Sequence, residues 1–241
     1  MSRQSVPPTA STRIRTEPVQ QRSTARVTLL LDAAAALIDE KGIDGLSTSD
    51  VATRSGSSVG VVYRYFPNIQ FLLRALAARN LERFLERAFP ADSFPSGSFP
   101  SGSFSSDSSS SEGAAGARWL ERLDQPFDAY VELARAEPGF RALRFGTIID
   151  ERFVGRDDST SGVNANDELV AALVEVLHKR YARLDPSESL LLDLEVAVEA
   201  ATALLQRAFT TDSEGDPRFI AKAKSITREI LTDYSAEIAA A

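Results

Sequence analysis

Residues 46–71, which read LSTSDVATRSGSSVGVVYRYFPNIQF, restrict the fold of this chain more than any other stretch. Ser47, followed three residues later by Asp50, forms the acidic variant of a capping box, which begins a helix. Gly56 ends that helix. Pro67 ends a second one, because a proline ring disfavours helical geometry at the residue before it. The stretch therefore predicts two short helices joined by a tight turn.

A third helix must complete this unit, because two helices this short cannot bury a core alone. Ser57 or Ser58 can cap the second short helix. Apolar residues in all three helices recur every three to four positions, so they can face a common centre. They are Val51 and Ala52 in the first short helix, Val59, Val62 and Phe66 in the second, and Val27, Leu30, Leu31, Ala34, Leu37 and Ile38 in a preceding helix that ends at Lys41 and Gly42. This arrangement is the helix-turn-helix plan.

The residue types over about 23–85, and the spacing between them, resemble those of the tetracycline-repressor (TetR) family of bacterial transcriptional regulators. The whole set is far more specific than any single motif. The matching residues are Gly42, Gly45, Leu46, Ser47, Asp50, Val51, Ala52, Gly56, Ser58, Gly60, Tyr63, Tyr65, Phe66, Pro67 and Asn68. There are two departures from the family pattern. Val61 and Val62 replace the common Thr-Leu, and Ile69 replaces a common Lys, which removes one expected phosphate contact.

The start of the second short helix carries small side chains that can enter a major groove about 12 Å wide. Gly60 costs helix stability, so a close approach to a neighbouring helix or to DNA is a reason for it. Tyrosine hydroxyls can donate to phosphates, and Arg64 can reach a phosphate or a base edge. Alternatively, the tyrosines are half-buried packing residues and Arg64 is merely solvated. The predicted DNA-contacting residues are Ser47, Thr48, Ser57, Ser58, Val59, Gly60, Val61, Tyr63, Arg64 and Tyr65.

The charge of the chain divides by region. Residues 1–88 hold 12 Lys and Arg against 8 Asp and Glu, net +4, whereas residues 89–241 hold 15 against 26, net −11, which gives the total of −7. An acidic body would keep DNA away from the wrong face of a basic head. Residues 1–22 have three prolines and a net charge of +3, and they predict a disordered basic arm. The arm either adds salt-sensitive DNA contacts or is a passive tail.

An all-α fold is expected for the whole chain. An N-terminal three-helix helix-turn-helix DNA-binding domain at 23–67 is followed by a linking helix at 68–89, which Asn68 can cap. Residues 90–117, rich in Ser, Gly and Pro, predict a disordered loop. A C-terminal helical ligand-binding and dimerisation domain would then occupy 118–241, with helices at about 117–136, 138–153, 164–184, 186–211 and 217–238.

The last two helices carry the features of a dimer interface. The helix at 186–211 is apolar around most of its circumference, so it should be covered on two sides. Four alanines, Ala197, Ala200, Ala201 and Ala203, would let a second subunit approach closely. The helix at 217–238 has an apolar stripe formed by Phe219, Ala223, Ile226, Ile230, Tyr234 and Ile238. The TetR resemblance implies the same homodimer through these two helices.

Enzymatic function is not predicted. The chain has no cysteine and one histidine, His178, so disulfides, thiolate zinc sites and histidine clusters are excluded. We therefore expect no catalytic residues, no metal and no cofactor. The sequence also has no apolar run long enough to span a bilayer and no signal-peptide core, so we expect no membrane contact and a cytoplasmic location.

Aromatic residues between 119 and 153 could line an apolar small-molecule pocket, or they could be ordinary core. The TetR resemblance implies an effector site there, and the predicted ligand-binding residues are Trp119, Phe127, Tyr130, Phe145 and His178. We expect a ligand-released repressor that binds a palindromic double-stranded DNA operator and an unidentified small-molecule effector. The alternatives are a regulator that needs no ligand, an activator, or a helical ligand-binding or scaffold protein that does not bind DNA.

Overall fold

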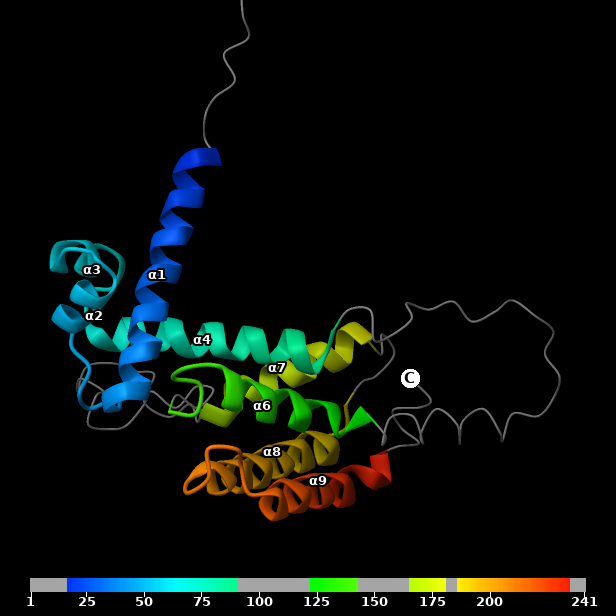
Figure 1. The fold of residues 1–241 in the computed structure, drawn as a ribbon. Helices are drawn as coiled ribbons and strands as arrows, with labels where there is room; N and C mark the ends of the chain where they lie inside the picture. Colours follow the sequence, from blue (N-terminus) through cyan, green and yellow to red (C-terminus); the bar gives the residue numbers. More distant parts are fainter. Residues whose placement is uncertain (1–16, 91–121, 143–164, 181–185, 235–241) are drawn as a thin grey trace, which may run out of the picture.

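The structure, a computed structural model, describes residues 17–90, 122–142, 165–180 and 186–234. Every regular element within those ranges is a helix, which confirms the predicted all-α fold for them. Figure 1 shows two parts: a head formed around α1, α2 and α3, and a body in which α6 and α7 lie between α4 and a layer made by α8 and α9. Among the described residues, no helix is both long and apolar enough to cross a membrane.

Helix α1 (Glu17–Lys41) begins inside the segment predicted to be a disordered arm. Pro18 lies in its first turn, where the missing backbone N–H costs nothing and the fixed φ suits a helix. The predicted end of the arm at residue 22 was therefore wrong, because residues 17–22 belong to α1 and Pro18 lies at the helix start. Residues 1–16 lie outside the described part of the chain. At its other end, α1 is followed by Gly42 with a φ of 77°.

The two short helices have the predicted caps. In α2 (Thr48–Arg54), the Ser47 hydroxyl accepts a hydrogen bond from the Asp50 N–H at 3.2 Å. In α3 (Val59–Tyr65), Ser58 rather than Ser57 is the N-cap, and its hydroxyl accepts from the Val61 N–H at 3.3 Å. Caps of this kind satisfy backbone donors that a helix start leaves without partners.

The turn between α2 and α3 is a Schellman motif. Gly56 has a φ of 62°, and its N–H donates to the Thr53 carbonyl at 3.2 Å. The next N–H, of Ser57, donates to the Ala52 carbonyl at 2.9 Å. This pair of hydrogen bonds ends a helix through a residue in the left-handed region, which glycine adopts without steric cost. The predicted role of Gly56 is confirmed.

The core of the head lies among α1, α2, α3 and the start of α4. Its buried residues include Leu30, Ile38, Val51, Val62 and Leu72. Val59 is an exception to the prediction, because its side chain is 38% exposed. It is the first residue of α3, and Val62 is the buried residue of this helix.

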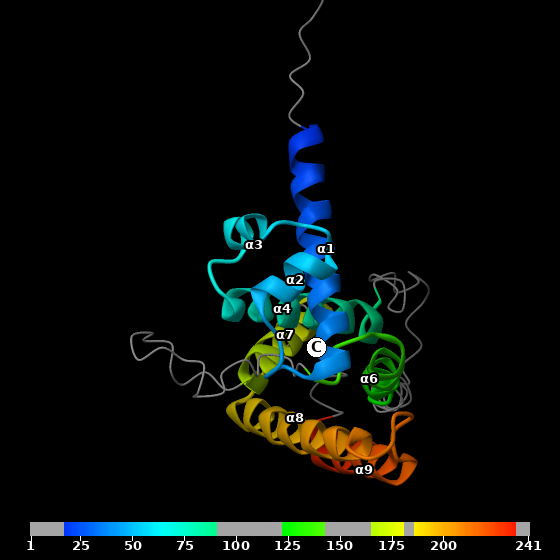
Figure 2. The same ribbon diagram turned by 60° about the vertical axis from the view of Figure 1, so that its left-hand side comes forward.

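Helix α4 (Ile69–Ala88) connects the head to the body. Asn68 is its N-cap, as predicted, and the Asn68 Oδ1 accepts a hydrogen bond from the Phe71 N–H at 3.0 Å. Leu72, Leu73 and Leu76, near its start, belong to the core of the head. Phe84 and Ala88, near its end, belong to the core of the body. Figures 1 and 2 show α4 crossing α1 and then running over the body helices.

The body contains α6 (Gln125–Ala136), α7 (Ala165–Arg180), α8 (Glu188–Phe209) and α9 (Pro217–Leu231), which continues as the short 3₁₀ helix η2 (Thr232–Tyr234). Helices α8 and α9 pack side by side in both ribbon views. The predicted loop at 90–117 lies outside the described residues apart from residue 90, as do 143–164 and 181–185.

In the body, one predicted helix is interrupted and one predicted helix start was wrong. The helix predicted over 117–136 is interrupted by a turn at Leu123 and Asp124, because Pro126 begins a new helix, α6. The helix predicted from residue 138 does not start there. Residues 138–142 form a turn, and Gly139 has a φ of 71°, which is incompatible with a right-handed helix.

The buried faces of α8 and α9 also differ from the predicted ones. In α9 the buried line is Ala223, Thr227 and Leu231, and Ile226 and Ile230 beside it are only partly buried. In α8, Ala197 is 2% exposed, so it packs in the core of its own subunit and cannot contact a second one. Three residues of the predicted α9 stripe do face the core: Ala223 is buried, and Ile230 and Tyr234 pack against the core of the body. The buried line also includes Thr227, because a widely apolar helix has several arcs of similar hydrophobicity.

Candidate functional site

The start of α3 forms an open surface. Val59 and Gly60 are exposed, and a Cβ built on Gly60 would meet only the Ser58 Oγ, at 4.0 Å. No neighbouring helix therefore requires a glycine at this position. Among the described residues, a close approach to a neighbouring helix therefore does not explain Gly60, and approach to DNA stays a prediction.

Tyr63 links α3 to α2 at the edge of this surface. Its ring is 51% exposed, and its hydroxyl accepts a hydrogen bond from the Thr48 Oγ1 at 3.3 Å. Thr48 is the first residue of α2, so the two predicted DNA-contacting residues lie together. The phenol can still donate its own hydrogen to a phosphate, because Thr48 uses only an acceptor position.

Tyr65 is held more firmly by the protein. Its side chain is half-buried against the core of the head, and the Arg64 guanidinium lies 5.1 Å from the centre of its ring. A hydrogen bond with Ser23 is the largest cause that lowers the pKa of the Tyr65 phenol, and Arg64 adds to it. These contacts favour the packing alternative for Tyr65. Arg64 itself is exposed on α3.

Helix α1 also supports this surface. The Arg26 Nη1 donates to the Ser57 Oγ at 3.4 Å, which places a cation beside the turn before α3. Ile69, which occupies the position of a common family Lys, packs against the core of the head. The substitution therefore replaces a possible phosphate contact with apolar packing.

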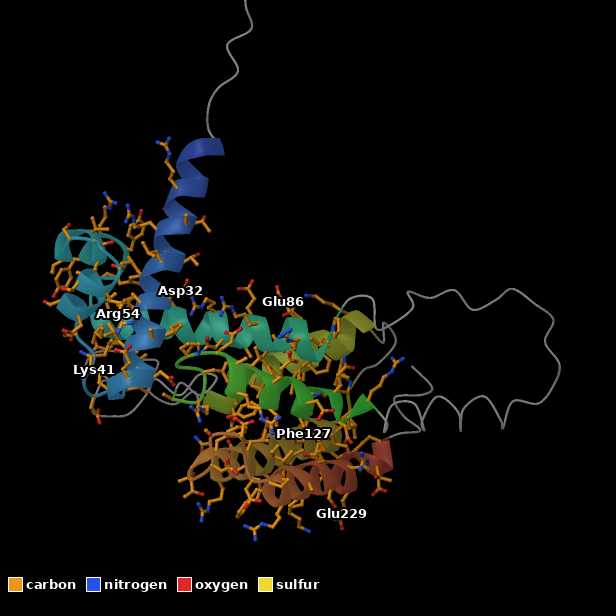
Figure 3. The ribbon with its side chains drawn as sticks, viewed as in Figure 1. Asp32, Lys41, Arg54, Glu86, Phe127 and Glu229 are labelled. Carbon is orange, nitrogen blue, oxygen red and sulfur yellow. The ribbon has the colours of Figure 1, made fainter. Side chains whose placement is uncertain are left out.

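Two ion pairs connect α1 with α2. The Lys41 Nζ lies 2.5 Å from the Asp50 Oδ2, and Arg54 pairs with Glu40 (Figure 3). Lys41, and after it the Ser47 hydroxyl, hold the pKa of the Asp50 carboxyl below its ordinary value. Asp50 consequently stays ionised, as its part in the capping box requires.

A cavity of about 140 Å³ lies in the body, among α4, α6, α7, α8 and α9. Its walls are mostly aliphatic and aromatic side chains from all five helices. Figure 3 shows Phe127 on the side of α6 that faces the layer of α8 and α9. Such a mostly apolar cavity with few polar groups is the usual form of a small-molecule site.

Only part of the predicted ligand-binding set lines this cavity. Phe127 and Tyr130 do, whereas Trp119 and Phe145 lie outside the described residues. His178 is exposed and is not among the residues that line this cavity, so its contact with a ligand stays a prediction that the cavity does not support. It follows Leu177, which does line the cavity, and a step of one residue turns a helical side chain by about 100°.

Most of the cavity wall was not predicted, because it comes from helices that are distant in sequence. One missed residue carried a signal: Thr227 stands between Ala223 and Leu231 at helical spacing, so it is a polar residue within an apolar line. It is 8% exposed and lines the cavity. Phe84, from α4, lines it as well.

The turn after α6 makes a second connection between body and head. A Cβ built on Gly139 would lie 2.9 Å from the carbonyl oxygen of Ala35 and 3.0 Å from its Cα, so the turn rests directly on the backbone of α1. Ion pairs flank this contact: Arg83 with Glu137 at 2.5 Å, and Arg141 with Asp39 at 4.0 Å.

Comparison with known proteins decides the family. Residues 30–76 match the model for bacterial regulatory proteins of the tetR family, and residues 117–234 match that for a tetracyclin repressor-like C-terminal domain. The crystal structure of a TetR-family transcriptional regulator from Streptomyces coelicolor is 33% identical, covers 87% of this chain and 97% of that one, and superposes with a TM-score of 0.64. The chain belongs to the TetR family.

A second solved structure, from work on the control of antibiotic production by bacterial hormones, resembles this TetR-family protein in fold. It is 17% identical, covers 88% of this chain and 97% of that one, and has a TM-score of 0.52. No curated protein matches the chain significantly. As a TetR-family member the protein is a DNA-binding transcriptional regulator, and α3 occupies the position of its recognition helix.

Proposed function

We propose that this regulator is a cytoplasmic repressor that binds a palindromic operator as a homodimer and releases it when a small molecule enters the body cavity. One observation carries the proposal. The same helix, α4, contributes Phe84 to the cavity wall and Leu72 and Leu76 to the core of the head. A ligand that displaces the end of α4 therefore acts on the helix that holds the head in place.

Geometry makes DNA binding sensitive to such a displacement. The two recognition helices of a dimer must be separated by about 34 Å, one turn of B-DNA, to enter successive major grooves. The turn at Gly139, which rests on Ala35 of α1, gives the body a second point of contact with the head. A tilt of α4 against this contact would change the spacing of the recognition helices.

The proposed dimer surface is the exposed face of α8. Leu192 is 59% exposed and Val196 is 47% exposed, and Ala200 and Ala203 continue the same face at helical spacing. Exposed large apolar side chains in a row are typical of an interaction surface. Glu195 and Glu199 border the row, so the apolar strip has a charged rim.

Replacing Leu192 and Val196 together with glutamate should convert the dimer to a monomer. Four carboxylates would meet across a two-fold interface, where like charges cost several kcal/mol. Sedimentation equilibrium measures the mass directly. Leu29→Glu is the matched control, because Leu29 is 43% exposed but lies on α1 in the head. A double variant that keeps the wild-type mass would exclude this face as the interface.

A mobility-shift assay tests the proposal as a whole, with DNA flanking the encoding gene as probe. We expect a shift that needs a palindromic site and an affinity that falls steeply as salt rises, because phosphate contacts release counterions. Transcription of the flanking genes should rise on deletion of the regulator. Lack of any specific shift would favour the helical ligand-binding or scaffold alternative. A specific shift with reduced transcription on deletion would indicate an activator.

A further inference from the structure

Thr227 of α9 has a buried hydroxyl that forms no hydrogen bond with any described residue. This sets it apart from other threonines in this chain. Thr28, Thr53, Thr210 and Thr232 each donate the hydroxyl to the backbone carbonyl four residues earlier, at 2.5–3.1 Å. Thr227 makes no such bond to Ala223. Buried hydroxyls are almost always paired, so this one indicates a missing partner.

The position of Thr227 identifies where that partner would be. Thr227 lines the body cavity, whose wall also includes the apolar residues Leu231, Leu205 and Val198. Four other side chains of the wall carry polar atoms and differ from it: Arg122 and Tyr130 already have partners, and Gln125 and Thr202 are only partly buried. Thr227 is thus the one cavity-lining residue among those described whose side-chain polar atom is both fully buried and unpaired.

The size of the cavity limits what can enter. Its volume is about 140 Å³. An apolar protein cavity of about 150 Å³ is known to accept benzene. An occupant of one ring with a small substituent therefore fits this volume.

We propose that the cavity binds a neutral, largely apolar molecule of about one ring in size that carries a single hydroxyl or carbonyl group paired with Thr227. The inference rests on the proposed function, because it names the class of effector for the same cavity. A hydroxyl can both donate and accept, so Thr227 can pair with either group. A charged group is disfavoured, because an ion buried among apolar side chains needs a counter-charge.

Phenol and toluene test this inference, since they have similar size and only phenol has a hydroxyl. Calorimetric titration of the full-length protein should show that Thr227→Val weakens phenol binding about tenfold or more, as expected when a buried hydroxyl loses its partner. Toluene binding should change by less than about threefold. Thr227→Ser, which keeps the hydroxyl, should preserve most of the affinity for phenol.

A second measurement needs no ligand. Thr227→Val should raise the melting temperature of the free protein, because it removes an unpaired buried hydroxyl. Thr210→Val should not raise it, since the Thr210 hydroxyl is exposed and already bonded to the Gln206 carbonyl. Equal loss of phenol and toluene binding in Thr227→Val would overturn the inference, because the residue would then act through packing alone.

Two further outcomes separate this inference from the proposed function. Benzoate binding tighter than phenol, abolished by Arg122→Gln, would overturn the assignment of a neutral ligand. Absence of binding by both phenol and toluene would overturn the inference and leave operator binding untouched. If phenol binds through Thr227 but operator affinity is the same with and without it, the inference stands and ligand-controlled release fails.

Discussion

Gly60→Glu should abolish specific operator binding and leave the fold of the protein intact. Gly60 is exposed on α3, and the one atom near its Cβ position outside its chain neighbours and the backbone of α3, among the described residues, is the Ser58 Oγ at 4.0 Å, so a longer side chain can extend into solvent in the free protein. In the complex, the new carboxylate would face the acceptor-rich groove and the phosphates. Like charges brought together at an interface cost several kcal/mol. With two copies in a dimer, we expect at least a hundredfold loss of affinity.

The variant Gly60→Ala separates size from charge. Alanine in a helix is more stable than glycine by about 0.5–1 kcal/mol, so the free protein should gain stability. If the recognition helix lies close to the base edges, the same methyl group should weaken operator binding. If Gly60→Ala raises the free energy of unfolding but lowers operator affinity, then Gly60 is needed for close approach to DNA and not for folding.

Fluorescence anisotropy with a labelled operator measures both effects. Ala221→Glu is a suitable control, because it adds the same charge at an exposed position of α9, far along the chain from the head. It should change affinity only slightly, through long-range charge that salt screens. Wild-type affinity in Gly60→Glu at physiological salt would show that this surface of α3 does not enter the groove.

The head could be predicted from the sequence almost residue by residue, because its signals are local. Ser47, Gly56 and Asn68 act through hydrogen bonds to residues at most five positions away. Such caps and turns depend on residue type and spacing, which the sequence contains. Val59 was misplaced because a helix of seven residues exposes its first turn, and apolar spacing alone cannot show where the partner helix ends.

The cavity could not be predicted in the same way, because its walls come from five helices between residues 84 and 231. Aromatic content indicated Phe127 and Tyr130, but the aliphatic wall from α7 and α8 has no local signature. The register of α9 was ambiguous for a physical reason: lines through Ile226 or through Thr227 are both compatible with a helical stripe. Packing against α8 selects the line through Thr227.

Gly139→Ala should weaken the contact between the body and the head and destabilise the protein. Gly139 has a φ of 71°, a region that costs an L-residue about 1–2 kcal/mol. Its new Cβ would also lie 2.9 Å from the Ala35 carbonyl oxygen, a backbone atom of α1 that cannot turn away. Overpacking of this kind adds about 1–3 kcal/mol. The expected loss of unfolding free energy is therefore about 2–5 kcal/mol.

Gly42→Ala is the matched control for this variant. Gly42 has a φ of 77°, but no atom lies within 4 Å of its Cβ position, so it should lose only the 1–2 kcal/mol that comes from the backbone. Urea denaturation of both variants gives the difference due to contact with α1. Equal losses would mean that the turn after α6 does not press on α1 in solution.

The same pair of variants tests how the body controls the head. A ligand that weakens operator binding must itself bind the operator complex less tightly by the same factor, typically 5- to 150-fold. With a ligand found by thermal-shift screening, that factor should be unchanged in Gly42→Ala. It should fall towards one in Gly139→Ala, because the displaced turn no longer transmits movement of the body to α1. A factor preserved in both variants would leave α4 as the route of coupling and exclude the contact between Gly139 and Ala35.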